Sequence, residues 1–409
     1  MSKLKAIDLF SGAGGLSWGL QEAGYQVLFA SDIDHASAMT YLRNHPGTEF
    51  FNGDICALSG ADILDATGLV PGDLDILAGG PPCQGFSIIG ARQRDDPRNE
   101  LFQQFIRVAR ELRPKAILIE NVPGLATLNG GKGVTAIAEA FAHAGYSCDV
   151  AELLAAQYGV PQMRWRMIFI GFRTDLGVAP GSGFPAPTHG KRGIGELIPN
   201  CAISPADSDG FLTTFDAIGD LPPVEAGCSA TEYDGPPVAL YQIRMRHGAS
   251  EILHNHYAPK LNARNLERIA YLKPGQDWRD LPHELLPEGM KRAHRKDHTR
   301  RYSRMTWQGV PRSIITRFRD PKSGEYSHPA QTRTISIREA ARIQSFPDRF
   351  IFLGSNSEQY DQVGNAVPPD LGRAIGLEIA ACLRGTPTHR LSNPFSRRPG
   401  LRQRQLSLA

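Results

Sequence analysis

Four short apolar runs, each followed by glycine, proline or an acid, constrain the fold more than any other feature of this chain. They span residues 5–10, 25–31, 74–78 and 115–119. Short runs with little polar alternation are typical of strands that are buried on both faces of a parallel sheet. Ligands of open α/β sheets bind at the carboxyl ends of the strands. The sequence therefore predicts an α/β domain with a mostly parallel, twisted sheet and a ligand site along one edge.

A glycine-rich turn, residues 11–16, follows the first run and leads into a helix that should end before Gly24. A strand, glycine turn and helix in succession place backbone N–H groups around a ligand. Ser17 stands where the dinucleotide fingerprint GxGxxG has its third glycine, which disfavours pyrophosphate binding. A purely structural turn is the alternative interpretation.

Acids follow the next two predicted strands. Asp32 lies about 20 residues beyond the first glycine, where a carboxylate can accept hydrogen bonds from a ribose diol. Asp34 is better interpreted as the cap of the following helix. Asp54 ends the next short strand. Together with the glycine turn, these strand ends fit a nucleoside-containing cofactor.

A cysteine occupies the loop at residues 79–87, directly after the third apolar run. Two prolines precede Cys83 and glycines flank the loop, so the thiol is held at a strand end like a nucleophile. A lone cysteine is more often a small buried hydrophobe. The residues around this loop decide between the two interpretations.

Polar groups also accompany the later strands. Glu120 ends the fourth run, where burial makes a carboxyl group easier to protonate and fits it for proton sharing; a structural acid beside Pro123 is the alternative. Gln162, Arg164 and Arg166 precede another apolar run, and strand alternation predicts that they share one face. We favour a functional role for them over a solvated edge.

The length and cysteine content bound the class of protein. A chain of 409 residues allows two domains. The N-terminus has no signal peptide, and no apolar stretch is long enough to cross a membrane. The six cysteines have neither disulfide nor zinc spacing, so we expect free thiols in a reducing cytoplasm and no metal site.

Charge is distributed unevenly along the chain. Residues 1–180 carry 14 Lys and Arg against 19 Asp and Glu, whereas residues 240–319 carry 17 against 7. The densest segment, residues 291–304, has seven basic residues, one acid and a tyrosine, which suits phosphate contacts and base reading. Residues 173–331 are also rich in Pro, Gly, Arg and His, as in a separate, loop-rich domain. A solvated basic face is the alternative.

The C-terminal part returns to regular structure. Residues 333–348 predict a turn, a helix capped by Ser336, and an end before Pro347. A last apolar helix should reach about Leu383. Residues 386–409 are Arg-rich and lack acids, which indicates a disordered basic tail.

Together these motifs resemble those of the DNA cytosine-5 methyltransferases over roughly residues 5–172 and 331–382. They occur in the family's order: Asp8 to Gly15, Pro81 to Gln84 with Phe86 and Ser87, Glu120 to Val122, Gln162-x-Arg-x-Arg166, Arg333 to Asp348, and Gly364 to Val367. The resemblance implies a Rossmann-like S-adenosylmethionine-dependent methyltransferase domain, residues 1–175 completed by 355–385. A smaller, loop-rich target-recognition domain would span residues 176–354.

The resemblance also implies a mechanism. Cytosine is not nucleophilic at carbon-5, so the Cys83 thiolate, in a loop shaped by Pro82, would first add to carbon-6. Glu120 would hold ring nitrogen-3 and the exocyclic amine, Arg166 the ring oxygen, and Arg164 would support the site. The enamine would then take the methyl group of S-adenosylmethionine, and loss of the carbon-5 proton would release the cysteine. The target base must leave the duplex to reach the thiol.

For the cofactor, the family's pattern maps onto ten positions: Phe10, Gly12, Gly15, Leu16, Asp32, Ile33, Asp54, Ile55, Leu101 and Asn365. Asp32 would take the ribose hydroxyls and Asp54 the adenine amine. Many members have Glu where Asp32 stands and an aromatic residue where Ile33 stands. The second departure replaces ring stacking on adenine by an aliphatic contact and should weaken cofactor binding without abolishing it.

The candidate DNA contacts are two polar residues of the cysteine loop and the arginines of the basic segment. They are Gln84, Ser87, Arg292, Arg295, Arg300, Arg301 and Arg304.

The favoured hypothesis is an active, monomeric methyltransferase of double-stranded DNA in the bacterial cytoplasm, associated with the nucleoid. It would be the modification half of a restriction–modification pair, with a cognate endonuclease acting on the same site. An RNA substrate is the second hypothesis, although the chain lacks the Cys-Phe-Thr tripeptide of the RNA-acting branch. A catalytically silent DNA-binding protein is the third, and the intact Cys83, Glu120 and Arg166 disfavour it.

Overall fold

The computed structural model describes residues 3–82, 97–127, 132–190, 210–292 and 300–391. The chain divides into two compact units. The first comprises Met1–Leu154, Trp165–Thr188 and Pro369–Ala409, and the second comprises Ala155–Arg164 and His189–Pro368.

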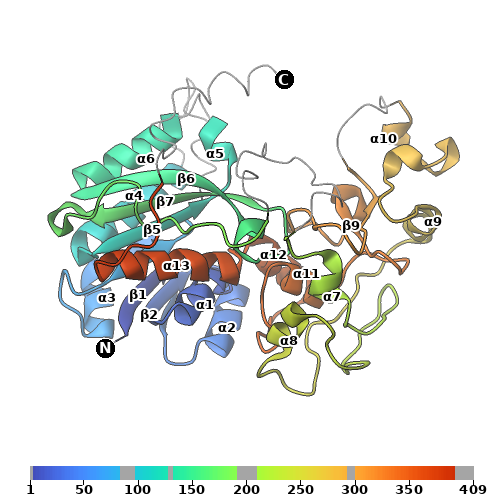
Figure 1. Cartoon of the computed structure of the whole chain (residues 1–409), viewed down its shortest axis with the longest axis horizontal. Helices are drawn as coiled ribbons and strands as arrows, with labels where there is room; N and C mark the ends of the chain where they lie inside the picture. The colour runs from blue at the N-terminus through green and yellow to red at the C-terminus, as the bar shows by residue number, and fades with distance from the viewer. Residues whose placement is uncertain (1–2, 83–96, 128–131, 191–209, 293–299, 392–409) are drawn as a thin grey trace. The chain divides into compact units, whose positions relative to one another are not determined.

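The first unit is built on a seven-stranded sheet with the order β3-β2-β1-β4-β5-β7-β6 (Figure 1). Its strands are β1 (Leu4–Leu9), β2 (Tyr25–Asp32), β3 (Glu49–Asn52), β4 (Ile76–Gly79), β5 (Ala116–Asn121), β6 (Tyr146–Leu154) and β7 (Trp165–Arg173). The first five strands in chain order pair in parallel, while β7 runs antiparallel to both β5 and β6. The predicted α/β fold with a mostly parallel sheet is confirmed.

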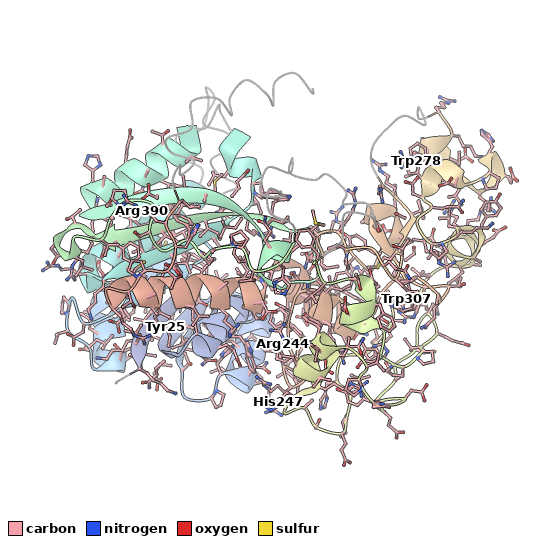
Figure 2. The ribbon with its side chains drawn as sticks, in the orientation of Figure 1. Tyr25, Arg244, His247, Trp278, Trp307 and Arg390 are labelled. Atoms are coloured by element: carbon pink, nitrogen blue, oxygen red, sulfur yellow. The ribbon has the colours of Figure 1, made fainter. Side chains whose placement is uncertain are left out.

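The helices of this unit follow the strands in alternation. They are α1 (Gly15–Glu22), α2 (His35–Asn44), α3 (Gly60–Thr67), α4 (Pro97–Leu112), α5 (Gly124–Thr127), α6 (Lys132–His143) and α13 (Pro369–Leu383), with the short 3₁₀ helices η1 (Ile55–Ala57) and η5 (Thr174–Leu176). The predicted cap of α2 is confirmed, because the Asp34 carboxylate accepts a hydrogen bond from the Ser37 N–H at 2.8 Å. Helix α13 packs along α1 (Figure 1). The hydroxyl of Tyr25, which is labelled in Figure 2, donates to the Gly376 carbonyl of α13 at 3.1 Å.

An apolar core holds the sheet of the first unit to its helices. Ile7, Leu77 and Ile117 on three adjacent strands are fully buried, and Phe105 and Phe141 pack against the same cluster. Burying one such side chain contributes about 1.5–3 kcal/mol. The backbone of this unit is therefore fixed by sheet pairing and apolar contacts.

The described part of the predicted tail, residues 386–391, is bound to the first unit. The Glu378 carboxylate on α13 accepts hydrogen bonds from the Thr388 and His389 N–H groups at 2.9 and 3.1 Å. Arg390, labelled in Figure 2, donates to the Pro180 carbonyl at 2.7 Å. The rest of the tail, residues 392–409, lies outside the described residues.

The second unit has little regular structure, as its composition predicts. Its helices are α7 (Thr214–Ile218), α8 (Leu240–Arg246), α9 (Ala263–Tyr271), α10 (Glu288–Lys291), α11 (Ile337–Ile343) and α12 (Asn356–Asn365). Its short 3₁₀ helices are η4 (Ala155–Tyr158), η8 (Trp278–Asp280), η9 (His283–Leu285) and η10 (Pro321–Ser323). Its described strands, β8 (Ser303–Arg304) and β9 (Glu325–Ser327), pair in parallel. Ser336 caps α11 as predicted, with Glu339 completing a capping box.

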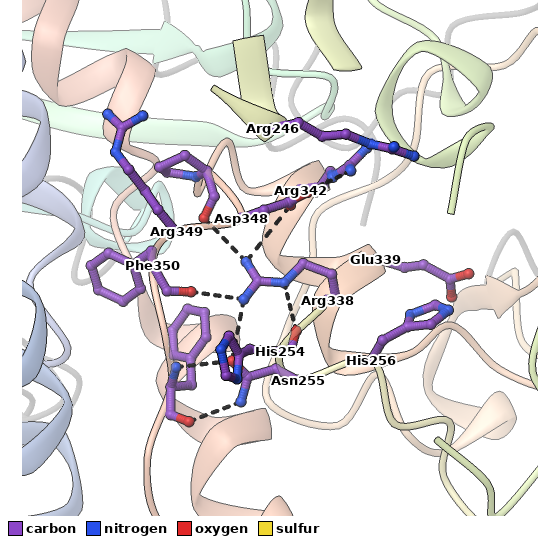
Figure 3. Close-up of polar contacts among 12 residues, drawn as sticks. Arg246, His254, Asn255, His256, Arg338, Glu339, Arg342, Asp348, Arg349 and Phe350 are labelled. Carbon is purple, nitrogen blue, oxygen red and sulfur yellow. Dashed lines mark hydrogen bonds and ion pairs between the residues drawn. The ribbon is translucent and has the colours of Figure 1, made fainter. Parts of the chain in front are cut away.

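Buried arginines hold many of the loops of this second unit in place. The guanidinium of Arg338 donates to the carbonyls of His254, Pro347 and Phe350 at 2.7–3.1 Å (Figure 3). Arg333 binds Glu339 through two hydrogen bonds of 2.7 Å. Arg342 binds Asp348 at 2.7 Å and Asp220 at 2.5 Å, and both arginines are fully buried. These side chains connect loop carbonyls and helix α11 in a unit whose described residues form only the two-stranded β8–β9 sheet.

A small apolar cluster forms around Trp278, which is labelled in Figure 2. It combines side chains from η8, η9 and α10 with Leu272 and Tyr302. The cluster supports the chain on both sides of residues 293–299, which lie outside the described ranges. Among the described helices, none is both long and apolar enough to cross a membrane.

Candidate active site

The sheet order of the first unit brings the polar strand ends of the sequence to one edge. Strand β1 lies between β2 and β4, and its last residues pair with Ala78 and Gly79 of β4. The turn after β1 and the loop after β4 therefore begin side by side. The strand order also reverses direction at β1 and β4, which is where open α/β sheets bind ligands.

The glycine turn after β1 is held by Asp32 from the end of β2. Its Oδ2 accepts from the Gly12 N–H at 2.7 Å and its Oδ1 accepts from the Asp34 N–H at 2.9 Å. Burial raises the pKa of Asp32, while these two backbone donors act in the opposite direction. Phe10 and Gly12 both have positive φ, 57° and 53°, and no described atom lies within 4 Å of a Cβ built on Gly12. As far as the described residues are concerned, this side of the turn has room for a ligand.

Helix α1 starts directly after this turn, and its first residues include the predicted Gly15 and Leu16, both buried. The N-cap residue is Gly14, whose lack of a side chain leaves the first N–H groups without a side-chain cap. Such a helix start offers hydrogen-bond donors and a partial positive charge to a bound group.

The remaining cofactor candidates differ in exposure. Ile33 is 71 % exposed, and Asp54 is exposed and caps η1 by accepting from the Cys56 N–H at 2.9 Å. Ile55 is instead 5 % exposed and belongs to the apolar core, against which Leu101 of α4 packs. Asn365 is the exposed last residue of α12, in the second unit.

Glu120 and Arg166 form an ion pair at the same edge of the sheet. Glu120 is the next-to-last residue of β5, Arg166 is the second residue of the antiparallel neighbour β7, and the Arg166 Nε atom contacts the Glu120 Oε1 atom. Both side chains are about nine-tenths buried. Burial lowers the pKa of the Arg166 guanidinium, and the Glu120 carboxylate raises it again. The two side chains are thus held together, nearly out of water, beside the start of the cysteine loop.

The start of that loop is attached to β5 by Asn121. The Asn121 side-chain amide donates to the Pro81 carbonyl at 3.1 Å, and a Cβ at Gly80 would lie 3.6 Å from Oε2 of Glu120. Pro82 is exposed. Sequence reasoning did not single out Asn121, although its position directly after Glu120, at a strand end, was the available signal.

Cys83, the predicted nucleophile, lies outside the described residues, as do Gln84, Ser87 and Arg295.

The predicted alternation of Gln162, Arg164 and Arg166 is wrong for the first two residues. Strand β7 begins only at Trp165, so only Arg166 lies on it. Gln162 binds the Ile343 carbonyl and the Gln344 side chain within the second unit. Arg164 is 1 % exposed and donates to the carbonyls of Ile314, Gly364 and Ala366 at 2.6–3.1 Å. These hydrogen bonds join segments that are far apart in sequence. The alternation of residues along one strand cannot reveal such contacts.

The candidate DNA-contacting arginines also separate into two kinds. Arg292 and Arg301 are exposed, and Arg300 is half-buried and pairs with Glu325 at 3.3 Å. Arg304 is buried, and its guanidinium donates to four carbonyls of the same unit, those of Ile269, Leu272, His328 and Gln331. We do not retain Arg304 as a DNA contact, because its donors are already used inside the protein.

Comparison with known proteins agrees with this arrangement. The family model of the C-5 cytosine-specific DNA methylases matches residues 4–381. The type II methyltransferase M.AgeI of Thalassovita gelatinovora is 34 % identical over 93 % of this chain and all of its own length. M.DdeI of Desulfomicrobium norvegicum is also 34 % identical, over 92 % of this chain and 88 % of its own length.

Solved structures show the same fold. A prophage-encoded E. coli protein described as a DNA modification methyltransferase superposes with a TM-score of 0.69 at 25 % identity, covering 93 % of this chain and 99 % of its own. The Dnmt2 methyltransferase of S. pombe has a TM-score of 0.51 at 16 % identity, over 94 % of this chain and 99 % of its own, which supports the fold alone. The resemblance drawn from the motifs is confirmed: the chain belongs to the C-5 cytosine-specific DNA methylase family, whose members transfer a methyl group from S-adenosylmethionine to carbon-5 of cytosine in DNA.

Proposed function

We propose that this enzyme is the modification methyltransferase of a restriction–modification system, acting on one cytosine of a specific duplex sequence. The observation that carries the proposal is the buried Glu120–Arg166 pair beside Gly80 and Pro81, where the cysteine loop begins. A carboxyl group, a guanidinium and a thiol-bearing loop at one strand edge are the groups that activation of a cytosine ring requires. The full-length similarity to type II methyltransferases supports the restriction–modification context.

The proposed nucleophile is Cys83. Its sulfur forms a bond to carbon-6 of the extruded base, and the displaced electron pair moves through the ring toward nitrogen-3. The attachment of Pro81 to Asn121 fixes the chain two residues before this thiol. When methylation is complete, nitrogen-3 returns its proton to Glu120. The carbon-5 proton then leaves to water, its electron pair re-forms the double bond between carbon-5 and carbon-6, and the sulfur–carbon-6 bond breaks to release the thiolate.

Glu120 and Arg166 have complementary roles in this proposal. Glu120 supplies the proton that nitrogen-3 takes up and accepts a hydrogen bond from the exocyclic amine. Arg166 donates to the ring oxygen and neutralises the carboxylate when no base is bound. Their mutual contact keeps both side chains in place before the substrate enters.

The glycine turn fits S-adenosylmethionine, which supplies an electrophilic methyl group on a sulfonium. Asp32 would accept from the ribose hydroxyls, while the uncapped start of α1 and the open side of Gly12 would meet the remainder of the ligand. Exposed Ile33 and Asp54 would contact the adenine. The buried Ile55 would pack behind the adenine-contacting residues Ile33 and Asp54.

The second unit is the proposed target-recognition domain. The exposed Arg292 and Arg301 and the paired Arg300 would contact DNA phosphates and bases, together with Arg295, Gln84 and Ser87. The anchoring of Arg164 and Arg304 inside this unit would keep the surrounding loops in a fixed shape. We further propose that the enzyme works as a monomer in the bacterial cytoplasm, on the nucleoid, alongside a cognate endonuclease.

Transfer of a tritiated methyl group from S-adenosylmethionine to duplex DNA tests this function, with tRNA as the competing substrate. We expect label in DNA only, and a loss of at least about 10³-fold in Cys83→Ala, because the covalent step is removed. Cys56→Ala, at an exposed cysteine of the same unit, is the matched control and should keep full activity. Label in tRNA would favour the RNA hypothesis, and no transfer to either substrate would favour the silent DNA-binding protein.

A further inference from the structure

A buried polar chain lies beneath the glycine turn and has no part in the proposed chemistry. Asp8, the next-to-last residue of β1, accepts through Oδ2 from the Ser17 hydroxyl at 2.7 Å. The Ser17 oxygen in turn accepts from the Tyr41 hydroxyl at 2.8 Å. All three side chains are essentially inaccessible to water. Ser17 is the residue that replaces the third glycine of the dinucleotide fingerprint. Its hydroxyl connects Asp8 to Tyr41, which a glycine could not do.

The glycine turn also packs against side chains that are in contact with this polar chain. Tyr41 stacks on His45, with ring centroids 4.3 Å apart, and His45 Nδ1 lies 2.9 Å from Gln21 Oε1 of α1. Gly14 has φ +97°, and a Cβ there would collide with the His45 ring. A movement of Asp8, Ser17 or Tyr41 would therefore also move the backbone around Gly14, where α1 begins.

The surroundings of Asp8 disfavour a negative charge. Its sheet neighbours are Ala30 and Ala78, and no described residue gives its Oδ1 a hydrogen bond. The groups that act on it are Ser17 of α1, the Asp32 carboxylate at the end of β2, and through Ser17 the Tyr41 hydroxyl of α2. The pKa of Asp8 is raised to about 7, chiefly by burial; the bonds from Ser17 act to lower it and the Asp32 carboxylate acts to raise it.

We propose that Asp8 is a positioning residue that keeps the glycine turn in its cofactor-binding conformation only while it carries a proton. In an ionised Asp8, the Oδ1 atom would carry negative charge away from water, near the Asp32 carboxylate and without a hydrogen bond from any described residue. Opening the turn would let water reach this oxygen and so lower the cost of the charge. Since the folded group has a raised pKa, the closed turn is fully stabilised below the ordinary carboxyl pKa of about 4, and that stabilisation is lost as the pH rises through about 7.

Calorimetric titration of the full-length protein with S-adenosylhomocysteine at pH 6, 7 and 8 tests this inference, which rests on the proposed cofactor site. We expect the wild-type Kd to rise about tenfold from pH 6 to pH 8, because binding requires the protonated form. Asp8→Asn, a neutral isostere, should bind as wild type does at pH 6 and lose most of this rise. Titration of the ligand's own amino group affects both proteins and cancels in the comparison.

Two further variants sharpen the test. Ser17→Ala removes a donor that favours the ionised form, so the midpoint of the pH dependence should move to higher pH; this variant also tests the inference if Asp8→Asn does not fold. Asp75→Asn is the matched control, because Asp75 is another buried aspartate of the same sheet but is paired with Lys115. It should keep the wild-type pH dependence.

Parallel curves for wild type and Asp8→Asn, or an unmoved midpoint in Ser17→Ala, would overturn the role of Asp8 alone. No binding by any of these proteins at any pH would overturn the proposed cofactor site, and the role of Asp8 with it.

Discussion

The two units of this enzyme are stabilised by different kinds of interior. In the first, adjacent parallel strands bury Ile7, Leu77 and Ile117 against helices, and backbone pairing sets the geometry. In the second, guanidinium groups such as those of Arg338 and Arg342 bind carboxylates and loop carbonyls. A sheet leaves the side chains at its edge available for chemistry, whereas a loop-rich unit needs buried charges to fix its shape.

Four tryptophans allow the two interiors to be followed separately in one protein. Trp18 and Trp165 belong to the first unit, and Trp278 and Trp307 to the second. Incorporation of 5-fluorotryptophan would therefore give fluorine resonances that report the unfolding of each unit.

The largest effect is expected from breaking the buried arginine–carboxylate pairs of the second unit. Arg342→Met removes the guanidinium that binds both Asp220 and Asp348, and leaves Asp220 only Arg246 and Asp348 only Tyr233 and the more distant Arg338. This should destabilise the second unit by about 3–5 kcal/mol. In urea, the Trp278 and Trp307 resonances should report unfolding at a lower concentration than in wild type. Arg317→Met, at an exposed arginine of the same unit, should change stability by less than about 0.5 kcal/mol. Equal effects of the two substitutions would contradict the ionic account.

Truncation of the apolar interior should act on the other unit. Leu77→Ala removes a fully buried side chain from β4 and should destabilise the first unit by about 2–5 kcal/mol, since the cavity cannot fully collapse. The fluorine signals of Trp18 and Trp165 should shift first in urea. Val70→Ala, at a residue that is 60 % exposed, serves as the control. Unchanged stability in Leu77→Ala would show that the sheet does not depend on this core.

The two interiors should also respond to pH in opposite directions. Arg333 holds the pKa of Glu339 well below its ordinary value, although burial alone would raise it. Its stabilisation is therefore complete above the ordinary carboxyl pKa and is lost as the pH falls through the lowered value. For Asp8, with a pKa of about 7, stabilisation is instead lost as the pH rises through neutrality.

Urea titrations from pH 3 to pH 8 with the fluorine labels measure this contrast. The second unit should lose stability toward pH 3, and the first toward pH 8. Glu339→Gln should remove the acid sensitivity that the Arg333 pair gives to the second unit. The same pH response in both units would contradict the assignment of these two groups.

The smallest effect is expected at the ligand-facing edge of the first unit. Ile33 is exposed, so Ile33→Tyr should leave unfolding unchanged while offering an aromatic ring to adenine. We expect S-adenosylhomocysteine to bind roughly two- to tenfold more tightly, measured by calorimetry. Leu42→Tyr, at an exposed leucine on α2, is the control and should not change affinity. Weaker binding in Ile33→Tyr would show that this side chain does not contact the adenine.

The local features of the fold were predictable from sequence, and the long-range polar contacts were not. The apolar runs predicted β1, β2, β4 and β5, and Asp34 and Ser336 were correctly interpreted as helix caps, because these signals span only a few residues. Arg164 was interpreted as functional from strand alternation and the Gln162-x-Arg-x-Arg166 motif, and Arg304 from the density of basic residues in 291–304. The hydrogen-bond partners of Arg164 lie up to 202 residues away and those of Arg304 up to 35, so the burial of both side chains follows only from the fold.

In the candidate site, too, some residues were predictable from sequence and others were not. Glu120 and Arg166 were predicted from strand ends and motif spacing, and they meet as an ion pair. Asn121 and the Asp8–Ser17–Tyr41 chain went unrecognised, since neither sequence distance nor residue type indicates that they support the turn and the cysteine loop.

The central claim is that Cys83 adds to carbon-6 of the target cytosine. Bisulfite sequencing of exposed DNA identifies the target, and a duplex with 5-fluorocytosine at that position blocks the final loss of the carbon-5 substituent. After incubation with S-adenosylmethionine, mass spectrometry of the digested complex should find the nucleotide attached to the peptide that contains Cys83, and no adduct in Cys83→Ala. An adduct on another cysteine, or its persistence in Cys83→Ala, would contradict the account.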